Sequence, residues 1–409
     1  MERMRCRGRS RSPRKFIEME SHMKKSLFVV AAAASFASVA HAQSSVTLYG
    51  LLDAGLTYTS NVDHNSKWAA GSGGINQSMF GLRGSEDLGS GLKAIFTLES
   101  GFNINNGKFA NNNGMFNRQA FVGLSSAQFG TVTLCRQYDA AQDYLAPLTA
   151  TGSWGGTYFA HPFNNDNLNT NGGLSVNNSI KYSSANYAGF TFGGTYGFSN
   201  QAGAFANNRQ YSVGAAYQWQ GLHLGAAYAQ QNNPGATNAA GTASNGGASD
   251  GVLANTAGPI TGDFRQRQFG AAGSYAFGPA TVGVAWTQSR VDNLVGAAPG
   301  QRQGRSNNYE VNGKYNVTPA LGLGIAYTFT DARGYAENAA GNDMKTRYHQ
   351  IGVQADYSLS RRTDVYAQAV YQHAMGDGGV ASIYSGDNTV PTSSSKNQTA
   401  ATVGLRHRF

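Results

Sequence analysis

Cysteine is almost absent from this chain of 409 residues, which contains only Cys6 and Cys135. Cys6 lies in an N-terminal segment that we expect to be missing from the mature protein, so no disulfide can form within one mature chain. A disulfide-rich secreted scaffold is therefore excluded. The remaining residues must be held together by backbone pairing and packing, with Cys135 as a free thiol.

Long apolar runs and catalytic motifs are also missing. No apolar run after Gln43 reaches eighteen residues, so a transmembrane helix is not expected, and no long segment shows helical periodicity. The eight histidines do not follow a metal-binding spacing such as HExxH, and no G-x-S-x-G motif occurs. We therefore expect neither an enzyme nor a bound cofactor.

The N-terminal region contains an export signal. Residues 23–42 have a short basic start, an Ala- and Val-rich apolar run and an Ala-x-Ala cleavage site, which together indicate a secretory signal peptide of the Sec pathway. The mature chain should begin at Gln43. Residues 1–22 match no part of this pattern and are interpreted as a mis-assigned extension, with Met23 as the true start. The alternative, a basic nucleic-acid-binding arm, does not suit an exported protein.

Most of the positive charge belongs to this leader. The whole chain has 31 Lys and Arg against 22 Asp and Glu, whereas residues 43–409 have 22 against 19. A sequence pI near 9.4 therefore says little about the mature protein. It gives no reason to expect a nucleic-acid partner.

Residues 43–409 are instead dominated by alternation between apolar and polar residues. Segments of ten to thirteen residues, such as 46–58, 92–102 and 321–330, each carry one apolar face, which suits a tilted membrane strand. The last segment, Asn397 to Phe409, places apolar side chains on one face and Arg on the other, and it ends on an aromatic residue. A surface strand of a soluble sandwich would alternate similarly, so no single segment is decisive.

The connections between these segments alternate in length. Seven short turns, at residues 86–91, 126–130, 184–189, 218–221, 278–279, 316–320 and 359–363, are separated by eight longer polar stretches. Sorted turns of this kind are typical of outer-membrane barrels. The sequence predicts an all-β fold, a 16-stranded antiparallel transmembrane β-barrel with short periplasmic turns and long extracellular loops. A barrel of this size has a lumen wide enough for water.

Several blocks resemble the general diffusion porins of β-proteobacteria, of the Burkholderia and Neisseria type. They include SSVTLYGLLDAGLTY at residues 44–58, FGLRGSEDLGSGLKAIFTLESGF at 80–102, RQAFVGLSS at 118–126, GSWGGTYF at 152–159, VNNSIKY at 176–182 and the VGLRHRF ending. The resemblance covers essentially all of residues 43–409. It implies a porin domain there and a third loop, residues 138–175, folded into the barrel as a constriction. Cys135 stands where such proteins usually have Gly.

Strand parity and the resemblance together suggest which residues line the constriction. Parity directs Arg83 and Glu99 inward and leaves the direction of Arg118 uncertain. Arg136 shares a face with the apolar Val132 and Leu134, so it can point inward only if the strand is irregular before it. The candidate set is Arg83, Glu99, Arg118 and Arg136 on the wall, with Asp139, Asp143 and Asp166 on the third loop. A basic wall facing an acidic loop would create a transverse field across the pore.

The expected function is passive, weakly selective diffusion of small hydrophilic solutes and ions across the outer membrane of a Gram-negative bacterium. A substrate-specific channel and an adhesin built on the loops are the alternatives. The resemblance implies a homotrimer, and small outer residues at Gly50, Ala54 and Ala94 would allow subunits to approach closely. The other expected partners are outer-membrane lipid, lipopolysaccharide and the barrel-assembly machinery, which would engage Phe409.

Overall fold

The computed structural model describes residues 45–110, 114–169, 171, 173–234, 246–248, 264–292, 303–337, 343–377, 379–386 and 389–409. The predicted extension (residues 1–22), the signal peptide (23–42) and the start of the mature chain at Gln43 lie outside the described residues. Within the described part, no helix is both long enough and apolar enough to cross a membrane.

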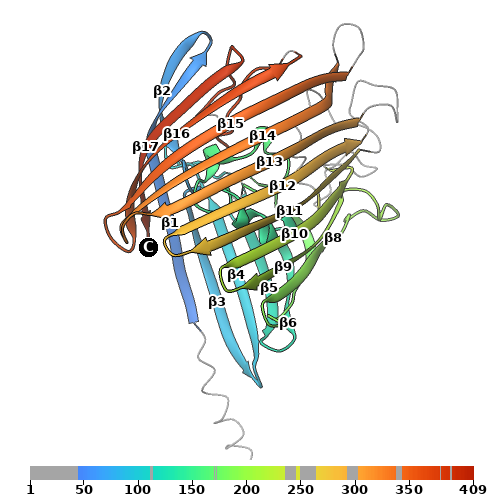
Figure 1. Ribbon diagram of the computed structural model, residues 1–409. Coiled ribbons are helices and arrows are strands. Elements are labelled where there is room, and N and C mark those ends of the chain that lie inside the picture. Colours follow the sequence, from blue (N-terminus) through green and yellow to red (C-terminus); the bar gives the residue numbers. More distant parts are fainter. Residues whose placement is uncertain are drawn as a thin grey trace, which may run out of the picture.

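The described residues form a succession of antiparallel strands that wraps into a tilted cylinder (Figure 1). The strands are β1 (Ser45–Val62), β2 (Asn65–Ser72), β3 (Met79–Gly89), β4 (Leu92–Gly101), β5 (Gln119–Ser126), β6 (Gly130–Gln137), β7 (Val176–Ser183), β8 (Phe190–Gly197), β9 (Arg209–Trp219), β10 (Leu222–Asn232), β11 (Arg265–Phe277), β12 (Ala280–Asp292), β13 (Gln303–Asn316), β14 (Leu321–Glu337), β15 (Asp343–Ser358), β16 (Thr363–Gly376) and β17 (Asn397–Arg408). Each pairs with the next along the chain from β3 onward.

The sheet closes between its first and last strands. Leu51 to Thr59 of β1 pair with Arg408 to Ala400 of β17. The other edge of β1 is shared, because its first half pairs with β3 and its second half pairs with β2. β2 and β3 thus occupy one strand position between them, and the predicted barrel of sixteen antiparallel strands is confirmed. Closure leaves no open sheet edge inside a bilayer.

Side chains alternate between the two faces of the wall as predicted. On β13, Tyr309 and Val311 are 49% and 59% exposed on the outside, whereas Glu310 is 2% exposed on the inside. The same contrast recurs along β9 to β17. An apolar outside and a polar inside are what a barrel in lipid around an aqueous lumen requires.

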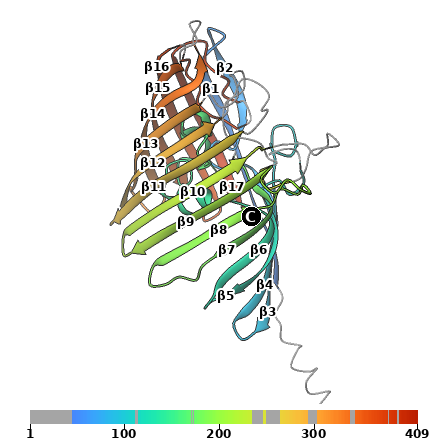
Figure 2. The ribbon, with the colours of Figure 1, turned by 90° about the vertical axis from the view of Figure 1, so that its right-hand side faces the viewer.

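All seven predicted short turns join consecutive strands at one end of the barrel. They follow β3, β5, β7, β9, β11, β13 and β15, and the longer connections leave from the opposite end (Figure 2). The short turns and the long connections therefore lie at opposite ends of the barrel, as the sequence predicted.

The outer surface of β1 differs from the prediction at one point. Gly50 is buried, because the ring of Phe409 lies within 2.5 Å of the position that a Cβ on Gly50 would take. The two residues also exchange backbone hydrogen bonds, at 3.2 Å and 3.0 Å. Gly50 therefore serves to seat the C-terminal aromatic ring and is not available to a neighbouring subunit.

Candidate functional site

The connection between β6 and β7, residues 138–175, lies inside the barrel (Figure 1). It contains α2 (Ala140–Tyr144) and three single turns of 3₁₀ helix, η3 (Ala146–Leu148), η4 (Thr157–Phe159) and η5 (Pro162–Asn164). We call it the inward segment. Asp139 begins α2 as its N-cap, since its carboxylate accepts a hydrogen bond from the Gln142 N–H at 3.1 Å.

Small residues on the inner wall make room for this segment. Leu145 and Leu148 pack against Ala227, Ala272 and Ala285 on β10, β11 and β12. The backbone oxygen of Tyr144 lies 2.2 Å from where a Cβ on Gly225 would be, and the ring of Trp154 lies 2.3 Å from the equivalent point on Gly324. A larger residue at either glycine would displace the segment.

Wall glutamines satisfy the backbone of the inward segment. The side-chain amides of Gln350 and Gln354 on β15 donate to the carbonyl oxygens of Ala160 at 3.0 Å and Trp154 at 2.9 Å, and Gln368 on β16 donates to Gly155 at 2.6 Å. Because buried backbone carbonyls need partners, these amides fix the segment along its length.

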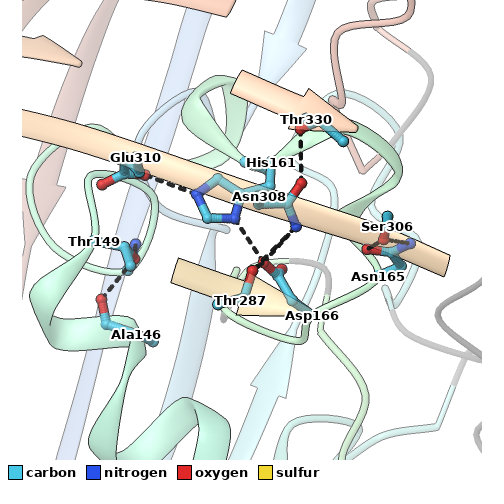
Figure 3. Close-up of polar contacts among 12 residues, drawn as sticks. Ala146, Thr149, His161, Asn165, Asp166, Thr287, Ser306, Asn308, Glu310 and Thr330 are labelled. Carbon is cyan, nitrogen blue, oxygen red and sulfur yellow. Dashed lines mark hydrogen bonds and ion pairs between the residues drawn. The ribbon is translucent and has the colours of Figure 1, made fainter. Parts of the chain in front are cut away.

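A charged attachment joins the segment to β13, which lies between these two parts of the wall. His161 donates through Nδ1 to Asp166 at 2.6 Å and through Nε2 to Glu310 of β13 at 3.0 Å, with no exposed imidazole surface (Figure 3). Burial alone lowers the pKa of His161, but the two carboxylates outweigh it and raise that pKa to about 10. His161 is therefore an imidazolium at neutral pH, and it lies between the carboxyl groups of Asp166 and Glu310.

Further polar contacts surround this attachment (Figure 3). Glu310 also accepts a hydrogen bond from the Ala150 N–H at 2.8 Å. Asp166 accepts from the Thr287 hydroxyl at 2.6 Å and from the Asn308 amide at 3.1 Å. Burial raises the pKa of Asp166, but the His161 imidazolium more than offsets this and lowers it below its ordinary value.

Two of the wall residues predicted for the constriction form an ion pair. Arg118 Nε lies 2.6 Å from Glu99 Oε1, and the residues are 7% and 6% exposed. The Tyr49 hydroxyl donates to the second oxygen of Glu99 at 2.8 Å, and the Arg118 guanidinium lies 5.9 Å from the ring centre of Tyr138. Parity had left Arg118 open, and the structure turns it toward Glu99 just before β5 begins.

Arg83 and Arg136 lie apart from this pair in different settings. Arg83 on β3 is exposed and its guanidinium lies 5.2 Å from the ring centre of Tyr49. Arg136 on β6 donates through Nε to the Asn117 carbonyl oxygen at 3.0 Å. The irregularity required before Arg136 is present, because Cys135 has φ of +95° and the register with β7 shifts after it. A positive φ also explains why Gly would suit position 135.

The three acidic residues of the inward segment contact the wall. Asp139 is fully buried and accepts a hydrogen bond from Gln210 of β9 at 3.1 Å. Asp143 lies 2.5 Å from the ammonium of Lys181 on β7. Asp166 is 2% exposed within the His161 attachment. Lys181 was not predicted, although it is the first basic residue after the segment in the sequence.

The sequence prediction also missed a second charged group, beside Trp154 of the inward segment. A cavity of about 460 Å³ between Trp154 of the segment and the wall is lined in part by Lys314, Asp356, Arg406 and Arg408. Arg406 donates to Asp364 at 2.9 Å and to Asp356 at 3.1 Å. The alternation of the last strand already placed both arginines opposite its apolar face and could have identified them.

The arrangement offers charged surface around a cavity beside the inward segment. Across those residues, no group of three or more His, Cys, Asp or Glu side chains could hold a metal ion. The described charges act on a passing solute through their field and hydrogen bonds.

Comparisons with known proteins agree on one family. Residues 29–377 match the family described as Gram-negative porin. An outer membrane porin protein of Bordetella pertussis is 30% identical over 438 aligned residues, which cover 95% of this chain and 100% of that protein. Outer membrane porin protein 32 of Delftia acidovorans is 29% identical, again with 95% and 100% coverage.

Solved structures show the same architecture. The anion-selective porin from Comamonas acidovorans matches with a TM-score of 0.70 and 25% identity, covering 90% of this chain and 100% of that one. The trimer form of OmpT from Vibrio cholerae matches with a TM-score of 0.62 over 90% of this chain and 99% of that one, and at 19% identity it supports the fold alone. Fold, family match and full-length relatives together show that the chain belongs to the Gram-negative porin family.

Proposed function

We propose that this porin is a passive outer-membrane channel for small hydrophilic solutes and ions, narrowed by the inward segment. The observation that carries the proposal is the attachment of residues 138–175 to the inner wall on several sides. It leaves the charged cavity beside Trp154 as aqueous space. A polar lumen with a fixed internal loop admits solutes by size and charge and needs no conformational cycle.

Weak ion selectivity is part of the proposal. The basic groups at the narrowing are paired with acids, as in Arg118 with Glu99 and Lys181 with Asp143. Arg83 and Arg136 add positive charge on the wall. Asp139 and Asp166 act from buried positions, where they hold the segment. Opposing charges and a Debye length of about 10 Å at 0.1 M salt leave only a small net preference.

A homotrimer is the proposed assembly. OmpT of Vibrio cholerae has been solved as a trimer. In this chain, small residues of β1, β2 and β17 form an apolar depression on the outer surface, lined by residues that include Ala54, Gly55, Ala70 and Gly404. Close approach of backbones at such a surface favours contact between copies within a bilayer. We also propose that Phe409, 43% exposed at the end of the chain, is read by the barrel-assembly machinery.

Liposome swelling tests the proposal directly. Vesicles containing the purified protein should admit sugars at rates that fall smoothly with solute size, without saturation. Saturable uptake of a single sugar would instead identify a substrate-specific channel, and no uptake would favour an adhesin.

A further inference from the structure

The cavity beside Trp154 has an apolar side as well as a charged one. Pro147, Leu148 and Trp154 of the inward segment line it together with residues of the wall. Pro147 is exposed and Trp154 is partly exposed. The cavity volume of about 460 Å³ lies within the range of about 300–1,000 Å³ that is usual for small-molecule sites. A ligand with one apolar part and one charged part would match both sides.

Neighbouring residues hold the Trp154 ring in one position. Its centre lies 5.1 Å from that of Phe159, with the two rings packed edge to face. The absence of a side chain at Gly324 makes room for the indole against β14. The ring therefore offers a fixed flat surface, of the kind on which another aromatic ring packs.

Lys314 supplies an unpaired cation on the wall. It shares the inward parity of Glu310 and Asn312 on β13, which are 2% and 8% exposed. Its side chain extends over Gly322 of β14, because Cε lies 3.2 Å from the position that a Cβ on this glycine would take. In the part of the chain that the structure describes, no ion pair or hydrogen bond engages the Lys314 ammonium group. This group is therefore available to an anion.

The other charges around the cavity are paired with one another. Arg406 lies 2.9 Å from Asp364 and 3.1 Å from Asp356, and Arg408 lies 2.5 Å from Asp364. Three cations, with Lys314 included, thus face two carboxylates. The surplus is one positive charge, and it belongs to Lys314. An anionic ligand is therefore favoured over a cationic one.

The cavity lies toward the short-turn end of the barrel. Lys314 and Asp356 are each two residues before the end of their strands, β13 and β15, and Arg408 ends β17. The ion pair of Arg118 with Glu99 belongs to another part of the wall, at β4 and just before β5. A ligand in the cavity is therefore held at a site distinct from that ion pair.

We propose that this cavity binds an aromatic carboxylate, with its ring against Trp154 and its carboxylate at Lys314. The ring buries apolar surface that a mineral anion would leave unused, and the carboxylate compensates the unpaired ammonium group. Binding should delay the passage of such a compound relative to a sugar of similar size. Only this effect on transport rests on the proposed function, because binding itself requires no permeation.

Fluorescence of Trp154 measures binding directly. The other three tryptophans share the parity of outward-facing residues, and all samples carry the changes Trp68→Phe, Trp219→Phe and Trp286→Phe. The ligand is para-nitrobenzoate, an aromatic carboxylate whose nitro group quenches indole fluorescence. The comparison ligand is para-nitrobenzyl alcohol, which has the same ring without the charge.

The test variant is Lys314→Gln, which removes the unpaired cation. The matched control is Lys93→Gln on β4, which removes an exposed cation of the inner wall outside the cavity. Both variants lose the same charge, so a difference between them reports on the cavity and not on the overall field of the lumen.

The acid should quench Trp154 saturably and at lower concentration than the alcohol. Lys314→Gln should raise the half-saturating concentration about threefold or more, and Lys93→Gln should leave it unchanged. Equal weakening by both variants would overturn the proposal in favour of a general field effect. Equal quenching by acid and alcohol would overturn it as well, and so would displacement by phosphate as effective as displacement by benzoate.

Single-channel recording provides a second measurement on the protein with all four tryptophans. Benzoate should interrupt the KCl current more often than acetate at equal concentration, and Lys314→Gln should remove this difference. A pore that conducts KCl without the difference contradicts the proposed binding site alone. A silent bilayer contradicts the proposed function, and the quenching of Trp154 then decides whether the site exists.

Discussion

His161 and Glu310 join the inward segment to the barrel wall across a sequence separation of 149 residues, with Nε2 3.0 Å from Oε2 and both side chains fully buried. Asp166 completes the group on the other imidazole nitrogen. A buried charge cluster of this kind is costly to disrupt, because removal of one partner leaves the others without compensation. The cluster therefore ties the segment to β13 at one defined position.

Replacement of His161 should loosen the segment. His161→Ala leaves two buried carboxylates without a cation, at a cost of about 3–5 kcal/mol. We expect noisier single-channel currents and faster proteolysis within residues 138–175. His373→Ala, a change on the outer face at the Asn397 contact, is the matched control. Identical current noise and cleavage in both variants would show that the cluster does not hold the segment.

The attachment should also depend on pH. Since the pKa of His161 is raised from about 6.5 to about 10, its stabilising contribution is complete below pH 6.5, declines above it and is lost beyond pH 10. The lowered pKa of Asp166 gives a contribution that is present above its ordinary pKa and lost as pH falls through the folded value. Current noise should therefore rise toward alkaline pH in the unmodified protein. If current noise depends on pH between 7 and 10 in the same way in His161→Gln as in the unmodified protein, this assignment is contradicted.

Cys135→Gly should stabilise the barrel. Cys135 has φ of +95°, a conformation that costs a non-glycine residue on the order of 1 kcal/mol. Thermal unfolding monitored by circular dichroism should shift upward for Cys135→Gly. Cys135→Ser, which removes the thiol and keeps the strain, should leave the midpoint unchanged. A serine variant as stable as the glycine variant would point to the thiol instead of the backbone.

Charges at the narrowing should set the small ion preference. The double change Arg118→Ala and Arg136→Ala removes two wall cations and leaves Glu99 uncompensated, so the reversal potential should move toward cation preference. Asp143→Ala removes the ion-pair partner of Lys181 and should move the reversal potential in the opposite direction. The measurement is the zero-current potential in a KCl gradient. If the double variant leaves it unchanged, these arginines do not line the pathway.

The barrel itself could be predicted from the sequence because the patterns that produce it involve residues close together in the chain. Each strand alternates between lipid and lumen, and each short turn is a few polar residues, so β13 and the short turn that follows it are visible without a structure. Glu310 and Arg406 could likewise be assigned to the inner face by parity alone.

The contacts of the inward segment could not be predicted in this way. No periodicity relates His161 to Glu310 or Asp143 to Lys181, because irregular backbone positions these side chains. Parity correctly directed Gly50 outward but could not show that Phe409, from the far end of the chain, covers it. These features depend on closure of the barrel, which brings distant residues together.

Single-channel current through the purified protein in a planar bilayer tests the central claim, a passive pore narrowed by the inward segment, most directly. The account predicts steady ohmic steps in KCl whose size scales with salt concentration and which no single sugar blocks. A bilayer that stays silent, or a current that one sugar blocks saturably, would contradict it.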